Sequence, residues 1–222
     1  MKKIALIYTV KPVLESFVPE LQKILVGDYR YYNLFDDFLA SDPGEIGYFS
    51  ITNKQRLFND IKNCELTGAD IIVVTCSTLT PAVALIRPFI TVPVLAIDDA
   101  MCSKAVTYGP RIRVVATARS TIEPTVTHLK SEAEKIHLQG VTIDSSYDEK
   151  AYSAMKCGDM GTHDRLVLDT IKKVKGYDVV VLAQASMAHL AKEGSELCGI
   201  PVLSSPELCR MSIAETLNGI NQ

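Results

Sequence analysis

The sequence repeats itself at a separation of 108 positions, without a gap over most of its length. The matched pairs fall at strand starts, strand ends and turns, and they include Ile4 with Ile112, Thr9 with Thr117, Asp70 with Asp178, and Pro93-Val94-Leu95 with Pro201-Val202-Leu203. An internal duplication of this length predicts two copies of one lobe of roughly 100 residues, related by a pseudo-twofold axis. The first lobe is expected to comprise residues 1–98 and 207–222 and the second residues 99–206, because the last helix is expected to cross back.

Short apolar runs alternate with helical patterns along the chain, as in a parallel sheet with helices on both faces. The expected strands are 4–8, 29–35, 71–74 and 94–97 in the first half, and 112–116, 141–143, 179–182 and 201–203 in the second. Each lobe is therefore predicted to be an α/β unit with a four-stranded parallel sheet. The active site is expected in the cleft between the two lobes.

Helix ends are predicted from capping residues and glycines. Pro12 is expected to open the first helix, Thr52 and Thr162 to cap two later ones, and Glu207 to start the last. Asp98 and Asp99 are interpreted first as cap and turn residues. Residues 36–51 and 144–161 are expected to be loops, long enough to cover a cleft and to select the substrate.

Composition excludes several classes of protein. The net charge of −3 and the scattered Lys and Arg residues argue against a nucleic-acid partner. The six cysteines show neither metal-ligand spacing nor a secreted disulfide framework, so reduced thiols in a cytoplasmic protein are expected. The apolar N-terminal stretch lacks a cleavage site and is interpreted as a strand, and no apolar run approaches the roughly 20 residues of a membrane span.

The candidate site residues follow the expected strands, where ligands bind in open parallel sheets. They are small, hydroxylic, cationic or amide side chains, namely Thr9, Lys11, Cys76, Ser77, Thr78, Thr117, Arg119, Ser120, Thr121, Gln184, Ala185 and Ser186. The repeat pairs Thr9 with Thr117, Lys11 with Arg119 and Cys76 with Gln184. Helix N-termini near these positions would offer N–H groups to an anion.

Simpler roles compete with each functional one. A cysteine at the end of a buried strand often serves as a small core residue. Thr9 and Thr117 could cap helices, and Lys11 and Arg119 could be solvated surface charges. The four histidines carry no motif, and His189, which follows the second strand-end segment, is interpreted as packed or solvated.

Three segments resemble the aspartate/glutamate/hydantoin racemase superfamily: Thr75-Cys76-Ser77-Thr78, residues 116–124 (Ala-Thr-Ala-Arg-Ser-Thr-Ile-Glu-Pro) and residues 181–188 (Val-Leu-Ala-Gln-Ala-Ser-Met-Ala). The resemblance covers essentially the whole chain. It implies an enzyme without cofactor or metal, in which cysteine thiols move a proton beside a substrate carboxylate. It also suggests a homodimer.

Carried over by position, Cys76 matches the catalytic cysteine of the first half, and Ser77 and Thr78 match the segment that grips the carboxylate. Residues 117–121 match a substrate loop. Gln184 stands where racemases have their second cysteine, and this departure matters because an amide cannot accept or return a proton. Gln184 can instead donate hydrogen bonds to a carboxylate or enediolate, while a helix N-terminus at Cys76 favours the thiolate.

Three functions remain open at this point. The first is a cofactor-independent isomerase of racemase type, acting on a small carboxylic acid or amino-acid derivative, with Cys76 as acid and base and with Ser186 or water returning the proton. The second is a lyase resembling arylmalonate decarboxylase, which needs one thiol. The third is a carboxylate-binding protein without turnover. A maleate-type isomerase is disfavoured because it uses two cysteines, and a Cys-dependent hydrolase because no histidine follows a matching strand.

Overall fold

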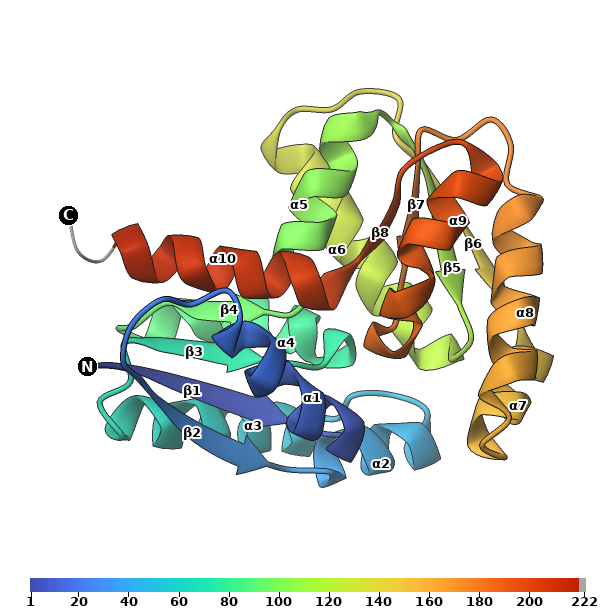
Figure 1. Cartoon of the computed structure of the whole chain (residues 1–222). Helices are drawn as coiled ribbons and strands as arrows, with labels where there is room; N and C mark the ends of the chain where they lie inside the picture. The colour runs from blue at the N-terminus through green and yellow to red at the C-terminus, as the bar shows by residue number, and fades with distance from the viewer. Residues whose placement is uncertain (220–222) are drawn as a thin grey trace. The chain divides into compact units, whose positions relative to one another are not determined.

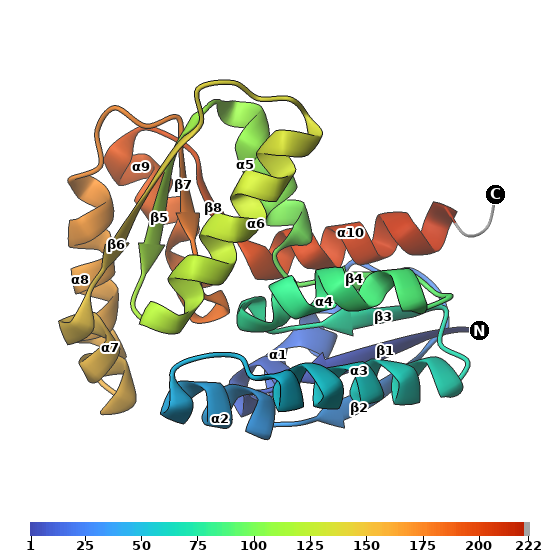
Figure 2. The ribbon, with the colours of Figure 1, turned by 180° about the vertical axis from the view of Figure 1, so that it is seen from behind.

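A computed structural model describes residues 1–219, and positions 220–222 of the predicted first lobe lie outside the described residues. The contacts divide the chain into two compact units. Unit 1 contains Met1–Ile97 and the C-terminal segment from Pro206, and unit 2 contains Asp98–Ser205. Each unit has one four-stranded parallel sheet with helices on its faces (Figures 1 and 2). The predicted α/β class with two such sheets is confirmed.

Unit 1 has the strand order β2-β1-β3-β4. Its strands are β1 (Lys2–Tyr8), β2 (Tyr29–Phe35), β3 (Ile71–Val74) and β4 (Val94–Ala96). Its helices are α1 (Lys11–Gln22), α2 (Phe38–Ile46), α3 (Ile51–Leu66), α4 (Thr80–Ile86) and α10 (Ser205–Gly219), with short 3-10 turns η1 (Ser77–Leu79) and η2 (Arg87–Phe89).

The central strands of unit 1 are buried on both faces. Every residue of β3 is buried, as expected for a β-branched apolar run inside a parallel sheet. Side chains from α3 and α4, among them Leu57, Ile61 and Val83, pack in one core cluster with Ala5 and Ile7 of β1. The helices α1 and α10 lie on the opposite side of this sheet in both views (Figures 1 and 2).

Unit 2 has the equivalent strand order β6-β5-β7-β8. Its strands are β5 (Arg111–Ala116), β6 (Thr142–Tyr147), β7 (Val179–Leu182) and β8 (Val202–Ser204). Its helices are α5 (Asp99–Tyr108), α6 (Ile122–Lys135), α7 (Glu149–Lys156), α8 (Met160–Lys172) and α9 (Ala191–Cys198), with 3-10 turns η3 (Arg119–Thr121) and η4 (Ala185–Leu190). Helices α5 and α6 lie on one face of the sheet and α8 and α9 on the other (Figure 1).

The repeat is visible in individual hydrogen bonds. In unit 1 the backbone N–H of Lys3 donates to Asp70 Oδ2 at 2.7 Å. In unit 2 the N–H of Arg111 donates to Asp178 Oδ2 at 2.8 Å. These residues match at the 108-residue separation. In each unit, an aspartate carboxylate therefore accepts a hydrogen bond from the backbone at the start of the first strand.

Both predicted loops contain helices, so these two interpretations are wrong. Residues 36–51 include α2, whose Leu39 is fully buried and holds the helix against the core. Residues 144–161 include the end of β6 and α7, which Asp148 caps by accepting from the N–H groups of Lys150 and Ala151. Burial of Leu39 in α2 and of Ala151 in α7 therefore outweighs the polar composition of these segments.

Three predicted helix starts are also wrong. Ser50, not Thr52, caps α3, because Ser50 has extended backbone angles and its side chain accepts from the N–H of Asn53. Asp159, not Thr162, caps α8. The last helix begins at Ser205 rather than Glu207. All six cysteines, which fall within the described range, are free thiols, and no helix in that range is long and apolar enough to cross a membrane.

Candidate active site

Cys76 lies just beyond the carboxyl end of β3, the second central strand of unit 1. β3 pairs with β1 in parallel, with Ile7 opposite Val74, so the segment after β3 runs beside the segment after β1. Thr75 secures this edge, because its backbone N–H and its hydroxyl both donate to Ile7 O, at 3.0 and 2.9 Å. Cys76 itself is half-buried, and its Sγ lies 2.9 Å from the hydroxyl of Thr78. A thiolate at this position would accept that hydroxyl hydrogen.

Two residues at the carboxyl end of the adjacent strand have buried hydroxyl groups without a hydrogen bond among the described residues. They are Tyr8, the last residue of β1, and Thr9, which follows it. Burial also raises the pKa of Tyr8 well above its ordinary value. Buried polar atoms nearly always have a partner, so two orphans beside a strand end point to a bound water or ligand.

Gln184 follows β7 and occupies the position in unit 2 that Cys76 occupies in unit 1. Its Oε1 accepts three hydrogen bonds, from Thr117 N at 2.7 Å, Ala118 N at 2.9 Å and Thr117 Oγ1 at 3.1 Å. Three donors around one atom fix which end of the amide is oxygen. The other end of the amide is then the Nε2 donor, for which no hydrogen bond is found among residues 1–219.

The other predicted residues differ in exposure. Thr117 is fully buried at the end of β5, and Thr121 is buried with its hydroxyl bonded to Ala118 O at 2.8 Å. Neither Thr9 nor Thr117 caps a helix, since Val10 and Thr121 hold the N-cap positions of α1 and α6. The remaining residues are half-buried or exposed, namely Lys11, Ser77, Thr78, Arg119, Ser120, Ala185 and Ser186.

Arg119 is exposed, but its guanidinium packs over the ring of Tyr147, 5.0 Å from the centroid. Tyr147 ends β6, the strand beside β5, so the contact joins two strand ends within unit 2. A cation held on an aromatic face is more ordered than a solvated one. Arg119 is therefore presented at the same sheet edge as Thr117.

A pair of acidic residues, Asp36 after β2 and Asp60 on α3, was not identified from the sequence. Asp36 directly follows β2, is buried and forms an ion pair with Arg56 of α3. Burial and the neighbouring Asp36 carboxylate raise the pKa of Asp60 to about 7. The position of Asp36 immediately after a strand was the one signal that could have indicated it.

A second polar group lies in unit 2 around Asp164 of α8. Its two carboxylate oxygens contact His163 Nδ1 at 2.7 Å and His189 Nε2 at 2.8 Å. Partial burial would raise the pKa of Asp164, but the hydrogen bonds to the two imidazoles outweigh it and lower the pKa. His189, which the sequence predicted to be packed or solvated, is half-exposed and bonded to Asp164 of α8.

A sequence profile of the Asp/Glu/Hydantoin racemase family matches residues 48–209. The match spans most of the chain and contains both Cys76 and Gln184. The chain belongs to this family, as its strand-end segments predicted. No curated protein matches the chain by sequence.

Solved structures share the fold at low sequence identity. A putative Asp/Glu racemase from Yersinia pestis has a TM-score of 0.72 and 19% identity, with 98% of this chain and 100% of that chain covered. An aspartate racemase homologue from Pyrococcus horikoshii OT3 has a TM-score of 0.71 and 17% identity, with the same coverage. Glutamate and allantoin racemases are also among the similar structures.

The unliganded arylmalonate decarboxylase shares the fold as well, with a TM-score of 0.59, 15% identity, and coverage of 99% of this chain and 94% of that chain. At such identities the likeness shows the fold alone. Family membership adds to it, and together they support a racemase-type function. Cys76 and Gln184 lie in different units, and their joint action on one substrate stays a prediction of the repeat.

Proposed function

We propose that the chain is a cofactor-independent racemase or epimerase of a small carboxylic acid or amino-acid derivative, with Cys76 as the group that moves the α-proton. The observation that carries the proposal is the environment of Cys76. Its thiol lies at a strand end beside Thr78, and the buried hydroxyl of Thr9, which has no hydrogen bond within the described part of the chain, follows the adjacent strand. A nucleophilic or basic atom and unsatisfied donors at one edge suit a carboxylate substrate.

The repeat supports a carboxylate position near Thr9. In unit 2, the N–H groups of Thr117 and Ala118 and the Thr117 hydroxyl surround one oxygen, that of Gln184. Thr9 and Val10 are the equivalent residues in unit 1, where the shorter side chain of Cys76 replaces the amide. A substrate carboxylate oxygen would supply an acceptor for the Thr9 hydroxyl, which has none among residues 1–219.

Gln184 is proposed to stabilise negative charge rather than to move a proton. Its oxygen is already bound by three donors, which leaves the Nε2 group to donate to an enediolate or carboxylate oxygen. A neutral amide can neither remove nor return the α-proton. Of the matched pair Cys76 and Gln184, Cys76 is then the member that can act as base.

One thiol has a consequence that can be measured. A two-base enzyme removes the proton on one face and returns a solvent proton on the other, so deuterium from D₂O enters mainly the inverted product. With a single thiol, exchange outpaces inversion, and deuterium enters recovered substrate of unchanged configuration. Inversion then depends on a second donor such as Ser186 or water.

The test is α-deuterium uptake in D₂O, followed by NMR on both enantiomers of aspartate, glutamate, hydantoins and allantoin, with enzyme-free samples as blanks. Cys76→Ser is expected to lower exchange by at least 10³-fold, about the loss seen when a catalytic nucleophile or base is removed. Gln184→Ala is expected to lower it about 10²-fold, the usual cost of one oxyanion donor. Cys198→Ser, which removes a thiol at the last residue of α9, serves as the matched control and should leave exchange unchanged.

Exchange that survives Cys76→Ser, or the absence of exchange with every compound, contradicts the proposal. If a carboxylate protects the protein against unfolding equally well before and after Cys76→Ala, while no compound turns over, the chain is a binding protein.

A decarboxylase is the second candidate, and the replacement of a thiol by Gln184 favours it. Loss of CO₂ from a substituted malonate leaves an enediolate, which one thiol protonates on one face. CO₂ release from arylmalonates, with a single product enantiomer and with loss of activity in Cys76→Ser, would establish this activity. No release from any malonate would remove it.

A further inference from the structure

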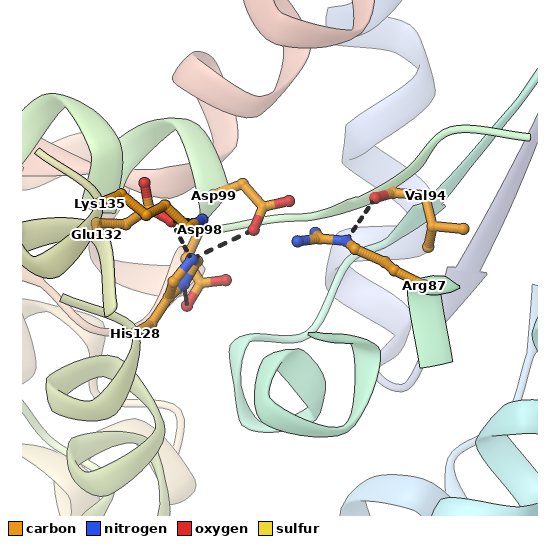
Figure 3. Close-up of polar contacts among 7 residues, drawn as sticks. All are labelled: Arg87, Val94, Asp98, Asp99, His128, Glu132 and Lys135. Atoms are coloured by element: carbon orange, nitrogen blue, oxygen red, sulfur yellow. Dashed lines mark hydrogen bonds and ion pairs between the residues drawn. The ribbon is translucent and has the colours of Figure 1, made fainter. Parts of the chain in front are cut away.

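A cluster of carboxyl, thiol and imidazole groups joins α5 to α6 in unit 2, and Figure 3 shows its carboxyl and imidazole members. We define the His128 cluster as Asp98, Asp99, Cys102, His128 and Glu132. Asp98 and Cys102 are fully buried, and the side chain of His128 is only 8% exposed. The sequence indicated no such group, because its members come from two helices and follow no common metal-binding motif.

Helical spacing brings the members together. Asp98 precedes the first residue of α5, and Cys102 lies four positions later, one turn along the same face. Asp98 holds the N-cap position of α5, as its interpretation as a cap residue predicted, although its side chain makes no capping hydrogen bond. His128 and Glu132 are likewise one turn apart on α6.

The cluster has the geometry of a three-ligand metal site. One ligand atom each from Asp98, Cys102 and His128 lies within 4.8 Å of the others. His128 Nδ1 is 3.4 Å from Asp98 Oδ2, and neighbouring ligands of a tetrahedral zinc ion lie about 3.3–3.8 Å apart at ordinary bond lengths. Nδ1 is buried and, among the described residues, receives no hydrogen bond of proper geometry.

The other imidazole nitrogen faces carboxylates, as in carboxylate–histidine–metal arrangements. His128 Nε2 lies 3.3 Å from Asp99 Oδ1 and 3.6 Å from Glu132 Oε1 (Figure 3). Such outer carboxylates hold the ring and keep the proton on the distal nitrogen, which leaves the first nitrogen with a lone pair for a metal. The two ring nitrogens therefore have the two environments that a ligand histidine needs.

The donor atoms of the cluster also suit a cation. Three carboxyl groups lie in the cluster, and Lys135, which is mostly exposed, pairs with Glu132. Carboxylate, thiolate and imidazole groups are the ligands that divalent transition-metal ions and Zn²⁺ take in proteins.

We propose that Asp98, Cys102 and His128 bind one divalent ion of the zinc type, which ties α5 to α6. The mixed oxygen, sulfur and nitrogen donor set suits Zn²⁺ rather than Mg²⁺ or Ca²⁺, which take oxygen ligands. On binding, the Cys102 S–H bond breaks, a metal–sulfur bond forms, and one proton is released to solvent. Water would complete the coordination.

The test uses full-length protein freed of metal by a chelator and carrying Cys157→Ser and His189→Gln, which remove an exposed thiol and an exposed imidazole as adventitious ligands. Titration with Co²⁺ is expected to give one bound ion per chain, with a thiolate-to-cobalt charge-transfer band in the near ultraviolet. Zn²⁺ should displace Co²⁺ with loss of the band. Zn²⁺ should also raise the melting temperature as its free concentration rises.

Two variants locate the site. Cys102→Ser should abolish the charge-transfer band, and His128→Gln should weaken binding at least 100-fold, whereas Cys198→Ser on α9 should change neither. If a variant fails to fold, the parent spectrum still decides, because a bound cobalt without a thiolate band overturns the proposal. The proposal is also overturned if no ion binds stoichiometrically, or if Cys102→Ser and His128→Gln leave binding intact. The cluster would then consist of ion pairs between His128 and the neighbouring carboxylates, without a metal.

Discussion

At the scale of single residues, the two units differ in how they satisfy the hydrogen-bond donors that follow their first strands. In unit 2, the long amide side chain of Gln184 reaches the N–H groups after β5 and satisfies them from within the protein. In unit 1, the short side chain of Cys76 bonds to Thr78 instead, and the Thr9 hydroxyl has no hydrogen bond among residues 1–219. One exchange of residue type therefore changes which donors are bonded at the two strand ends, and the proposed function assigns the unit 1 end to a ligand.

Asp60 provides a residue-scale prediction on pH. Its folded-state pKa of about 7 exceeds the ordinary carboxyl value of 3.8 that holds after unfolding. The contribution of Asp60 to the free energy of unfolding should therefore be highest below about pH 4. It should fall as the pH rises to about 7. Asp60→Asn is expected to raise the free energy of unfolding at pH 8 by about 1–2 kcal/mol, less than the full pKa shift implies because the carboxyl is partly solvated.

Urea unfolding of both proteins from pH 4 to pH 8 measures this effect. Asp169→Asn, at an exposed carboxylate of α8, is the control and should keep the parent pH profile. An identical pH slope in the parent and in Asp60→Asn would contradict the prediction.

At the scale of elements, the turn between α5 and β5 depends on a glycine. Gly109 has a φ of +148°, and a Cβ built there would lie 2.5 Å from Asp178 Oδ2 and 2.9 Å from Asp178 Cβ. Asp178 cannot move away without losing its hydrogen bonds to the N–H and guanidinium of Arg111. The start of the central strand and the preceding helix therefore meet where only glycine fits.

Gly109→Ala is expected to lower the free energy of unfolding by about 2–4 kcal/mol, through backbone strain and the displaced carboxylate. Gly140→Ala is the matched control. It also has a positive φ, +69°, but nothing lies within 4 Å of its Cβ position, so about 1 kcal/mol is expected. Denaturant unfolding measures both, and equal losses would show that Asp178 contributes nothing.

At the scale of the whole chain, the helices after the fourth strands change unit. Helix α5 follows β4 of unit 1 but belongs to unit 2, and α10 follows β8 of unit 2 but belongs to unit 1. Within unit 1, the side chains of Cys209, Ile213 and Leu217 of α10 are buried, and the Lys2 ammonium donates to Leu217 O. The sheet of unit 1 is thus completed by residues distant in sequence.

Ile213→Ala is expected to lower the free energy of unfolding of unit 1 by about 3 kcal/mol, because a fully buried isoleucine is truncated. Hydrogen exchange followed by mass spectrometry should show faster exchange in β1 and β3 than in β5 and β7. Met211→Ala, at an exposed position of the same helix, should change the free energy by less than about 0.5 kcal/mol. Uniform acceleration in both sheets would contradict the assignment of α10 to unit 1.

Much of the architecture follows from local sequence. The central strands β3 and β7 were predicted with their observed bounds, because continuous β-branched runs have few other places to be buried. The repeat indicated the duplicated sheets. Helix starts were less accurate, because Ser50 and Thr52 are both good caps and only the backbone angles decide which one accepts the N–H. The polar segment 36–51 contains helix α2 because Leu39 packs in the core of unit 1, and composition does not predict this contact.

The candidate site divides in the same way. Strand-end position and residue type were enough to select Cys76 and Gln184, since both are local properties of a parallel sheet. The three donors on the Gln184 oxygen, the orphan hydroxyl of Thr9 and the meeting of His128 with Asp98 depend on residues brought together from distant segments. Hydrophobic periodicity determined which elements form, because it acts along one segment at a time. Tertiary packing alone decided which polar groups are buried together, because hydrogen bonds and ion pairs depend on distances in space that no local pattern sets.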